Sequence, residues 1–562
     1  MIIQPILDLV AICAKKGIEH AILSPGSRCA PLTLAFARHP EIHARTISDE
    51  RSAAFIALGV AQQLSQPVVL VCTSGSAALN YYPAVAEAFF QQVPLLILTA
   101  DRPPEWIDQW DGQTIFQPDV YGKHIKKSFQ FPDSFSNPEQ AWHSGRMVNE
   151  AINLAKQFPA GPVHMNIPLR EPFYPMDGEK FEFPEHPREF TLVSSQTQLS
   201  EESLKHIKNR LNDFTRILIV PGQQKPNPHI QSLLDDLSKN QKAVIVTDSI
   251  SNLQSDATIN LHDHWLGNES INQSLVPDLV ISFGKSVISK SLKQFLRKSE
   301  TSHWHIQPDG QAKDTYQHLT RILACSPTQF LGWLSQNLPD QNEEFYLKWT
   351  GLEKAVDSAL PDVFSKIEFG EYSALHFLLK KIPATSKLHL ANSMAVRYVN
   401  FLGKRTQEII CNRGTSGIDG SNSTAVGCTF TTKELVSLIT GDMAFFYDRN
   451  AFWHNYSTPN LRVIILNNHA GGIFRLIDGP AKQPELEEFF ETKQQLSANH
   501  LAEEFGFFYL KVKNQQELES ALTDFYSPST RPKILEIESS SPKNAEILKE
   551  VKSKISEVIM GF

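Results

Sequence analysis

The stretch Leu438–Phe474, LITGDMAFFYDRNAFWHNYSTPNLRVIILNNHAGGIF, decides how the rest of the chain is interpreted. It opens with an apolar strand that ends in a Gly-Asp pair at Asp442, and a second apolar strand, Arg462–Leu466, leads to an Asn-Asn pair that includes Asn468. If these strands are neighbours in a parallel sheet, Asp442 and Asn468 lie together at its carboxyl edge, where open α/β sheets bind ligands. A carboxylate and an amide oxygen suit Mg²⁺, which keeps phosphate oxygens and water as its other ligands.

The spacing of the two pairs resembles the diphosphate-binding motif of thiamine diphosphate enzymes, although Met443 stands where that motif has glycine. The resemblance implies thiamine diphosphate and Mg²⁺ or Mn²⁺ as cofactors. It implies a metal held by Asp442, Asn468 and the main chain of Ala470, and a cofactor that contacts Gly441, Asp442, Met443, Ala444 and Asn468. An alternative is that both pairs are ordinary strand-end turns, since Gly, Asp and Asn favour turns for conformational reasons.

Length and composition limit the class of protein. A chain of 562 residues is expected to form three or four domains. Its net charge of -8 and its lack of Lys/Arg runs give no support for binding to nucleic acid or to a membrane surface. No apolar stretch approaches the ~20 residues of a membrane span, and the start lacks the basic segment of a signal peptide. Six scattered cysteines without CxxC spacing are typical of reduced core residues, so we expect a cytoplasmic protein.

Short apolar runs alternate with segments of helical period along the chain, which is the pattern of parallel, doubly wound sheets. A charged, proline-containing segment near residue 180 interrupts this pattern and predicts a linker. We therefore predict an α/β fold with three doubly wound parallel-sheet domains of the thiamine diphosphate enzyme type, at residues 1–180, 190–345 and 350–562. The central domain is interpreted as structural, because its Gly284-Lys285-Ser286 lacks the first glycine of a P-loop.

The first domain supplies an acid at Glu50, which follows the predicted second strand and opens a helix rich in small residues. Thiamine diphosphate is activated when a carboxylic acid hydrogen-bonds its aminopyrimidine ring, and in the family a glutamate stands at this position. The alternative is an acid that only interacts with the helix dipole. Family members bring the positions of Glu50 and Asp442 together from two different chains, so the resemblance implies a homodimer or a dimer of dimers.

Five further stretches are more specific than the metal motif. They are LSPGSRCAPLTLAF (23–36), CTSGSAALNYYPAVAEA (72–88), LTADRPPEWID (98–108), NRGTSGIDGSNSTA (412–425) and NNHAGGIF (467–474). These stretches are similar to the menaquinone-pathway family that makes 2-succinyl-5-enolpyruvyl-6-hydroxy-3-cyclohexene-1-carboxylate. The resemblance implies two small-molecule substrates: 2-oxoglutarate is decarboxylated, and the succinyl unit is added to the ring alkene of isochorismate.

Both substrates carry several carboxylates, so we expect arginines in the pocket, whose planar forks bind carboxylates through two hydrogen bonds. The family motifs supply three arginines and one serine for this role: Arg28, Arg397, Arg413 and Ser27. Ser393 matches a cofactor-binding position of the family, and Gln113 matches a catalytic and substrate-binding position. The alternatives are surface ion pairs for the arginines and turn or cap chemistry for the other two residues.

Apolar residues of the motifs are assigned by the same resemblance. Ile418 matches the residue that bends the cofactor, whereas Ile473 and Phe474 are expected on the substrate side, although apolar residues after a loop are more often core. Ile107 stands where many family members have arginine, so we expect another cation, Lys290, to bind the substrate instead.

Two other functions are consistent with part of the sequence. Another thiamine diphosphate 2-oxoacid decarboxylase or carboligase, such as an acetohydroxyacid synthase, explains Glu50 and the metal motif equally well, but not the five specific stretches. A catalytically silent α/β scaffold or a nucleotide-binding regulator would make Glu50 and Asp442 incidental.

Overall fold

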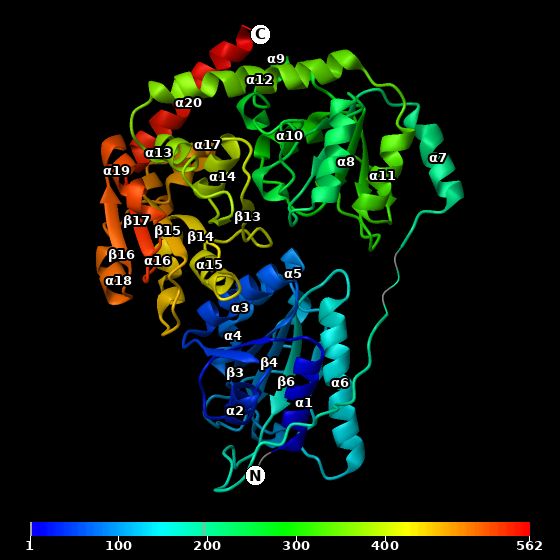
Figure 1. Cartoon of the computed structure of the whole chain (residues 1–562), viewed down its shortest axis with the longest axis vertical. Helices are drawn as coiled ribbons and strands as arrows, with labels where there is room; N and C mark the ends of the chain where they lie inside the picture. Colours follow the sequence, from blue (N-terminus) through cyan, green and yellow to red (C-terminus); the bar gives the residue numbers. More distant parts are fainter. Residues whose placement is uncertain (1–2, 194, 196, 562) are drawn as a thin grey trace.

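Three parallel β-sheets follow one another along the chain in the computed structural model, which describes residues 3–193, 195 and 197–561 (Figure 1). Each sheet belongs to a unit of alternating strands and helices, as the sequence predicts. In every sheet the order of the strands reverses direction part-way across, which is the topology of doubly wound folds. The predicted α/β fold with three parallel-sheet domains is confirmed.

The first sheet has both faces buried. Its strands are β1 (His20–Leu23), β2 (His43–Thr46), β3 (Val68–Cys72), β4 (Leu95–Asp101), β5 (Ser128–Gln130) and β6 (Val163–Pro168), in the order β2-β1-β3-β4-β6-β5. Its helices are α1 (Gln4–Lys15), α2 (Ala30–Arg38), α3 (Glu50–Leu64), α4 (Ser76–Asn80), α5 (Tyr82–Gln91) and α6 (Pro138–Lys156). Ile22 and Leu70 belong to one apolar core, whereas Leu23 and Val71 belong to another. Helices on both sides are needed because successive strand residues point to opposite faces.

The second sheet follows a connection over residues 169–193, 195 and 197–200 that contains no helix or strand, where the sequence predicts a linker. Its strands are β7 (Ile217–Pro221), β8 (Val244–Ile245), β9 (Leu279–Phe283), β10 (Ser302–Ile306) and β11 (Leu319–Leu323), in the order β11-β10-β9-β7-β8. The helices of this unit are α7 (Glu201–Leu211), α8 (Pro228–Lys239), α9 (Glu269–Ser274), α10 (Lys290–Lys298) and α11 (Pro327–Asn337).

The third sheet contains the two strands with which the sequence analysis begins. Its strands are β12 (Lys387–Leu390), β13 (Glu408–Ile410), β14 (Val436–Gly441), β15 (Leu461–Asn467), β16 (Phe508–Val512) and β17 (Lys533–Glu538), in the order β13-β12-β14-β15-β17-β16. Its helices are α12 (Glu343–Ser365), α13 (Glu371–Leu378), α14 (Met394–Phe401), α15 (Ser421–Thr429), α16 (Asp442–Tyr447), α17 (Asp478–Ala481), α18 (Asn499–Glu504), α19 (Gln515–Phe525) and α20 (Ser541–Met560).

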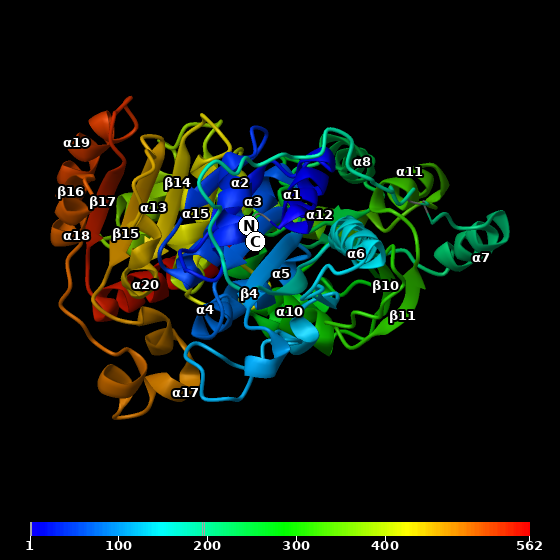
Figure 2. The ribbon, with the colours of Figure 1, turned by 90° about the horizontal axis from the view of Figure 1, so that it is seen from below.

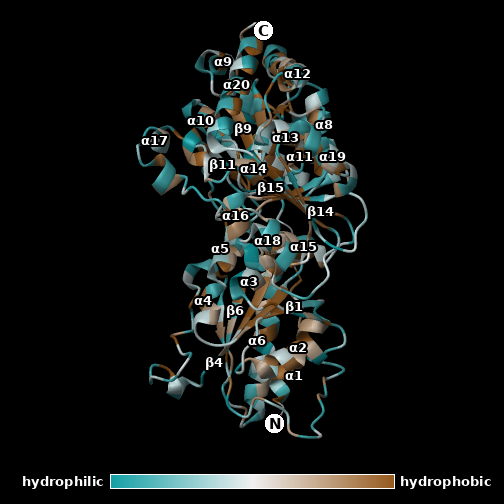
Figure 3. Ribbon diagram, turned by 90° about the vertical axis from the view of Figure 1, so that its left-hand side faces the viewer, coloured by the Kyte–Doolittle hydropathy of each residue, from teal (hydrophilic) through white to brown (hydrophobic). Residues whose placement is uncertain are grey.

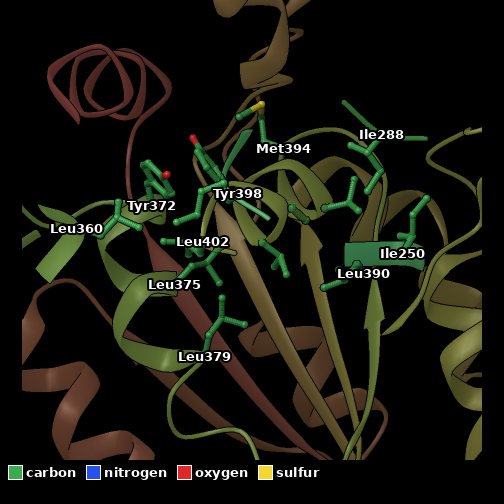
Figure 4. Close-up of a cluster of buried hydrophobic side chains, with 14 of the residues drawn as sticks. Ile250, Ile288, Leu360, Tyr372, Leu375, Leu379, Leu390, Met394, Tyr398 and Leu402 are labelled. Carbon is green, nitrogen blue, oxygen red and sulfur yellow. The ribbon is translucent and has the colours of Figure 1, made fainter. Parts of the chain in front are cut away.

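The second and third units share one apolar core. Ile250 and Ile288 from the second unit belong to the same buried cluster as Leu390 and Met394 from the third (Figure 4). The long helices α12 and α20 pack against each other at the end of the molecule where the chain finishes (Figure 1). Because these units are joined by a continuous core, where one domain ends and the next begins stays a prediction.

The first and third units meet through two helices whose backbones touch. A Cβ atom added to Gly59 of α3 would lie 2.1 Å from the carbonyl oxygen of Thr424, and one added to Gly427 of α15 would lie 2.1 Å from that of Ile56. Only glycine permits this approach, so the small residues of α3 fix the position of the first unit below the third (Figure 3).

Two further expectations concern the core and the membrane. The six cysteines are all buried, as predicted for small core residues. Among the residues that the structure describes, no helix is both long enough and apolar enough to cross a membrane.

Candidate active site

The two strands of the metal motif are neighbours. β14 and β15 pair in parallel, with Gly441 opposite Leu466, so Asp442 and Asn468 leave the sheet at the same carboxyl edge. Asp442 opens α16 and is 2% exposed. Its carboxylate accepts hydrogen bonds from the side chain of Gln494 at 2.7 Å and from the main-chain N–H of Met443 at 2.9 Å.

Burial raises the pKa of Asp442 to about 6, and the hydrogen bonds from Gln494 and Met443 oppose this rise. The N–H of Ala470 acts on the same carboxylate, so the main chain of the loop after β15 lies against Asp442. The predicted metal-binding trio of Asp442, Asn468 and Ala470 is therefore brought together in space.

The side chain of Asn468 is oriented by Glu371, a residue that the sequence analysis missed. Its Nδ2 donates to Oε1 of Glu371 at 2.6 Å, while its Oδ1 accepts from the N–H of Ala470 at 3.0 Å. Glu371 is 1% exposed at the start of α13, and burial raises its pKa to about 7, with the charge of Asp442 adding to the rise. The amide thereby presents its oxygen toward the loop and its nitrogen toward Glu371.

The chemistry of this edge fits a hard divalent cation. A carboxylate and an amide oxygen stand on adjacent strands next to the main chain of Ala470, and such oxygen donors are those that Mg²⁺ prefers. No group of three or more His, Cys, Asp or Glu side chains is placed to hold a metal in the described part of the chain. This absence does not test the predicted metal ligands, because Asp442 is the one member of that set that is a His, Cys, Asp or Glu.

Glu50 stands at a different place in the chain. It is the first residue of α3 and is partly buried, and burial raises its pKa, with the charge of Asp49 adding to the rise. The charge of Glu50 acts on the buried thiols of Cys29 and Cys72, whose pKa values it helps to raise. The acid therefore lies near the carboxyl ends of β1 and β3.

The residues on either side of Glu50 fix the start of α3 against the end of α16. Asp49 accepts a hydrogen bond from Asn450 at 2.7 Å, and Arg51 donates to the carbonyl of Tyr447 at 2.8 Å. Asp442 lies at the other end of α16, a helix of six residues. At 1.5 Å per residue this separates the two ends by about 8 Å.

Two guanidinium groups lie together at the carboxyl edge of the first sheet. Arg28 follows β1 and donates to the carbonyl of Leu169 at 2.7 Å, whereas its Nε is buried without a hydrogen-bond partner. Burial lowers the pKa of Arg28, and the positive charge of Arg102, which follows β4, lowers it further. Arg102 forms an ion pair with Asp111 and reaches Ser74 at 3.5 Å, and its side chain is 12% exposed.

Arg102 was not singled out from the sequence, although it lies in the quoted DRPPE segment. Lys290, expected to replace a missing arginine at Ile107, is exposed at the start of α10, and its role stays a prediction. Arg102 is thus a further cation in this part of the first domain.

A second group of cations surrounds Arg413. Its guanidinium donates to Oδ1 of Asn392 at 2.7 Å, and its Nε is buried without a partner. Arg397 donates to the carbonyl of Ser393, and burial followed by the charge of Arg413 lowers the pKa of Arg397. Burial also lowers the pKa of Lys293, with Arg413 and Arg397 contributing and Asp248 opposing, so Lys293 is a third cation near this pair.

Comparison with known protein families gives three matches that follow the order of the sheets. Residues 8–125 match "Thiamine pyrophosphate enzyme, N-terminal TPP binding domain", residues 194–390 match "Middle domain of thiamine pyrophosphate", and residues 391–537 match "Thiamine pyrophosphate enzyme, C-terminal TPP binding domain". The chain belongs to the thiamine pyrophosphate enzymes. Thiamine pyrophosphate is thiamine diphosphate under its other name, so the predicted cofactor is confirmed.

Relatives within this family carry the name expected from the specific stretches. Proteins called 2-succinyl-5-enolpyruvyl-6-hydroxy-3-cyclohexene-1-carboxylate synthase are 47% identical in Cytophaga hutchinsonii, with 99% of both chains covered, and 38% identical in Christiangramia forsetii, with 97% of both covered. A protein of the same name from Porphyromonas gingivalis is 36% identical, with 98% of this chain and 96% of the relative covered. The resemblance to this synthase family is confirmed. The alternative of a catalytically silent scaffold is not supported, because these relatives are named as enzymes.

The remaining predicted residues of the thiamine pyrophosphate site lie on loops and helix ends. Ser27 and Gln113 are exposed, and the main chain of Gln113 packs against Gly75. Ile418 is 39% exposed. Ile473 and Phe474 are half-buried in the short helix Gly472–Leu476.

His469 lies in the metal loop and contacts a residue outside it. Its Nε2 lies 2.8 Å from Oε1 of Glu538, which also pairs with Lys511 at 2.6 Å. This arrangement holds the loop against the end of β17, in agreement with a structural role for His469.

A cavity of about 690 Å³ lies where the three units meet. Its lining includes Gln91, Gln223, Lys285 and Cys411, and none of the predicted site residues lines it. The cavity adjoins the segment that carries Arg413, because Cys411 belongs to its lining.

Proposed function

We propose that this thiamine pyrophosphate enzyme decarboxylates 2-oxoglutarate and adds the succinyl unit to isochorismate, giving 2-succinyl-5-enolpyruvyl-6-hydroxy-3-cyclohexene-1-carboxylate in menaquinone biosynthesis. The observation that supports it most directly is the presence of two separate groups of arginines. One group is Arg28 with Arg102, and the other is Arg397 with Arg413. Each group contains a buried Nε that has no hydrogen-bond partner, and a bound anion would supply that partner. Two multiply carboxylated substrates need two such groups.

The first step depends on how the chain holds its cofactor. When bound, thiamine diphosphate supplies a nucleophilic carbon and an electron sink for decarboxylation. Glu50 holds a proton against the aminopyrimidine ring, and the raised pKa that burial gives it favours this protonated form. Asp442, Asn468 and the main chain of Ala470 would hold the Mg²⁺ or Mn²⁺ that binds the diphosphate.

Further residues contact the cofactor around these anchors. Gly441, Met443, Ala444 and Ser393 would hold the diphosphate end of the cofactor, and Ile418 would support its bent form. The partial exposure of Ile418 in a single chain supports contact with a ligand or with a second copy.

We further propose that the active enzyme is a homodimer, alone or paired into a dimer of dimers, in the cytoplasm. In one chain the start of α3, which carries Glu50, contacts the end of α16, whereas Asp442 opens that helix. A second copy that brings its Glu50 to the first copy's Asp442 would complete two equivalent sites.

The carboxylates of the substrates are bound by the two arginine groups. Arg28 and Arg102, with Ser27 and Gln113 nearby in sequence, act at the edge of the first sheet. Arg397 and Arg413 act at the edge of the third, where Ile473 and Phe474 exclude water from the reacting carbon. Asp111 neutralises Arg102 in the absence of a substrate carboxylate.

Turnover tests this proposal directly. Enzyme with thiamine diphosphate and Mg²⁺ is expected to release carbon dioxide from 2-oxoglutarate and to form the cyclohexene adduct only when isochorismate is present. Conversion of pyruvate in place of 2-oxoglutarate would instead favour an acetohydroxyacid synthase type of carboligase. Calorimetry with the cofactor alone separates a failure of binding from a failure of substrate choice.

A further inference from the structure

Glu87 is a buried acid of the first unit that acts on a loop of the third. It lies on α5, is 1% exposed, and its carboxylate accepts hydrogen bonds from two consecutive residues of that loop. The N–H of Gly414 donates at 2.7 Å, the N–H of Thr415 at 2.6 Å, and the hydroxyl of Thr415 at 2.6 Å. These residues directly follow Arg413.

The contact between α5 and the loop is also tight along the backbone. A Cβ atom added to Gly414 would lie 2.6 Å from the carbonyl oxygen of Glu87, so no other residue fits without a shift of the helix or the loop. The loop therefore has one position relative to α5, which the carboxylate and the glycine fix together.

A second side chain of α5 supports Glu87. Gln91 donates to the Glu87 carboxylate at 2.5 Å and accepts from Gln223 of the second unit at 3.3 Å. Gln223 also donates to the carbonyl of Cys411 at 2.8 Å, just ahead of Arg413. All three units thus converge on the short segment that carries Arg413.

We propose that Glu87 is a positioning residue for Arg413, which sets where its guanidinium lies and thereby how tightly a substrate carboxylate binds. This inference rests on the proposed function, in which Arg413 binds that carboxylate. Hydrogen bonds to an ionised carboxylate are stronger and shorter than neutral ones, and three of them from adjacent groups restrict the main chain on one side of Arg413. Among the residues that the structure describes, Asn392 alone accepts a hydrogen bond from the Arg413 guanidinium.

The first test is the variant Glu87→Gln. Glu87→Gln keeps the size of the side chain but replaces one acceptor oxygen by a donor, so one or more of the three donors loses its partner. We expect the KM of a carboxylated substrate to rise about tenfold while kcat changes less than about threefold, in keeping with loss of uniform binding. The affinity for thiamine diphosphate, measured by calorimetry, stays at the wild-type value.

A double-mutant cycle separates positioning from a general structural role. In an Arg413→Ala background, Glu87→Gln is expected to add little to the rise in KM, because the group that it positions is gone. If the two effects multiply instead, Glu87 acts on the fold and not through Arg413, and the inference is overturned. Glu353→Gln is the matched control, since Glu353 is a buried acid that accepts from the main chain of Asn260 and Leu261 and should leave KM unchanged.

Two further measurements test the inference if Glu87→Gln does not fold or if the proposed reaction does not occur. Should Glu87→Gln not fold, Thr415→Val removes only the hydroxyl donor at nearly constant volume and is expected to raise KM in the same direction by a smaller factor. Binding of succinate, an unreactive dicarboxylate, is measured by calorimetry for the wild type and both variants. Wild-type protein that binds succinate but fails to turn over 2-oxoglutarate would refute the proposed reaction, whereas equal succinate affinity in the wild type and Glu87→Gln would refute the role of Glu87.

Discussion

The side-chain amide of Asn468 donates a hydrogen bond of 2.6 Å to Glu371. Because this bond engages the amide nitrogen, it leaves the amide oxygen as the atom available to a metal at Asp442. Residues behind a metal ligand set its orientation, and their loss typically lowers metal affinity. Glu371 comes from α13, 97 residues before Asn468. The metal motif of the sequence is thus completed by a part of the chain that the motif does not include.

Removing the acceptor at Glu371 should weaken metal binding. Glu371→Leu is expected to lower the affinity for Mn²⁺, measured by electron paramagnetic resonance with thiamine diphosphate present, about 10- to 100-fold, because the amide of Asn468 is then free to turn. Glu371→Gln keeps an acceptor oxygen and should stay close to the wild type. Equal Mn²⁺ affinity in the Leu and Gln variants would show that the hydrogen bond to Asn468 does not orient it.

Glu50 is expected to control the rate and not the binding of the cofactor. Glu50→Gln should lower kcat by about 10²- to 10⁴-fold, the usual contribution of a positioned proton-transfer group, with little change in the calorimetric affinity for thiamine diphosphate. Asp49→Asn is the control, since asparagine caps a helix as well as aspartate does. Near-normal turnover of Glu50→Gln would contradict the assigned role.

Mixing two inactive proteins tests whether Glu50 and Asp442 come from different copies. Random exchange of Glu50→Gln and Asp442→Ala subunits makes half of the dimers mixed, and each mixed dimer has one intact site, so about a quarter of the wild-type activity should return. Activity that does not return after verified subunit exchange would place both groups in the site of one chain.

The parts of the fold that were predicted are those with continuous apolar runs. β14 and β15 are buried on both faces, and the predicted bounds of β15, Arg462–Leu466, differ from the observed ones by one residue at each end. The sequence gives no strand prediction for β5, β11 or β16, and each of them lies at the edge of a sheet. Their residues are partly exposed, so they lack the apolar run that indicates a buried parallel strand.

The site was predictable where a family motif is local in sequence and unpredictable where it depends on contacts between distant elements. Asp442 and Asn468 follow neighbouring strands, so their proximity follows from the topology. Glu371 and Arg102 reach the site through packing of separate elements. In the sequence Glu371 is an ordinary acid at the start of a helix, and Arg102 is an ordinary arginine after a strand. Only the fold shows that the first contacts Asn468 and that the second lies beside Arg28.

Arg102 and Asp111 should change substrate binding in opposite directions. Arg102→Lys removes the fork that can bind a carboxylate through two hydrogen bonds, so the KM of one carboxylated substrate is expected to rise about tenfold or more. Asp111→Asn removes the charge that now pairs with Arg102 and should lower the same KM. Changes in the same direction for both variants would mean that the pair only stabilises the loop around Asp111.

Glu353 predicts a pH dependence of stability. Burial raises its pKa to about 7 from 4.5, opposed by hydrogen bonds from Leu261 and Asn260 and by the charge of His262. The folded state therefore holds this proton to higher pH than the unfolded state, and the stability that protonation contributes is lost as pH rises through about 7. The melting temperature of Glu353→Gln minus that of the wild type should become more positive between about pH 5 and about pH 8. A difference that stays constant over this window would show that Glu353 is ionised throughout.

The segment between Gly471 and Glu491 is held closed at its two ends and is expected to open when Glu491 is changed. The carbonyl of Glu491 accepts from the N–H of Gly471 at 2.7 Å, and its fully buried carboxylate accepts from Arg475 at 2.6 Å and from the hydroxyl of Ser541. Between these ends α17 stands out from the third unit (Figure 2).

Removing the Glu491 carboxylate leaves Arg475 without its buried partner, which releases the short helix that carries Phe474. Glu491→Ala is therefore expected to speed trypsin cleavage within residues 472–490 about tenfold, because cleavage of a locally opened segment follows its open population. Glu487→Gln is the control, since Glu487 also pairs with Arg475 but is 52% exposed and should have a small effect. Because exclusion of water from the reacting carbon depends on the same segment, Glu491→Ala should also release carbon dioxide without forming the adduct more often than the wild type does. Unchanged cleavage together with unchanged coupling of the two steps would show that this buried ion pair does not control the segment.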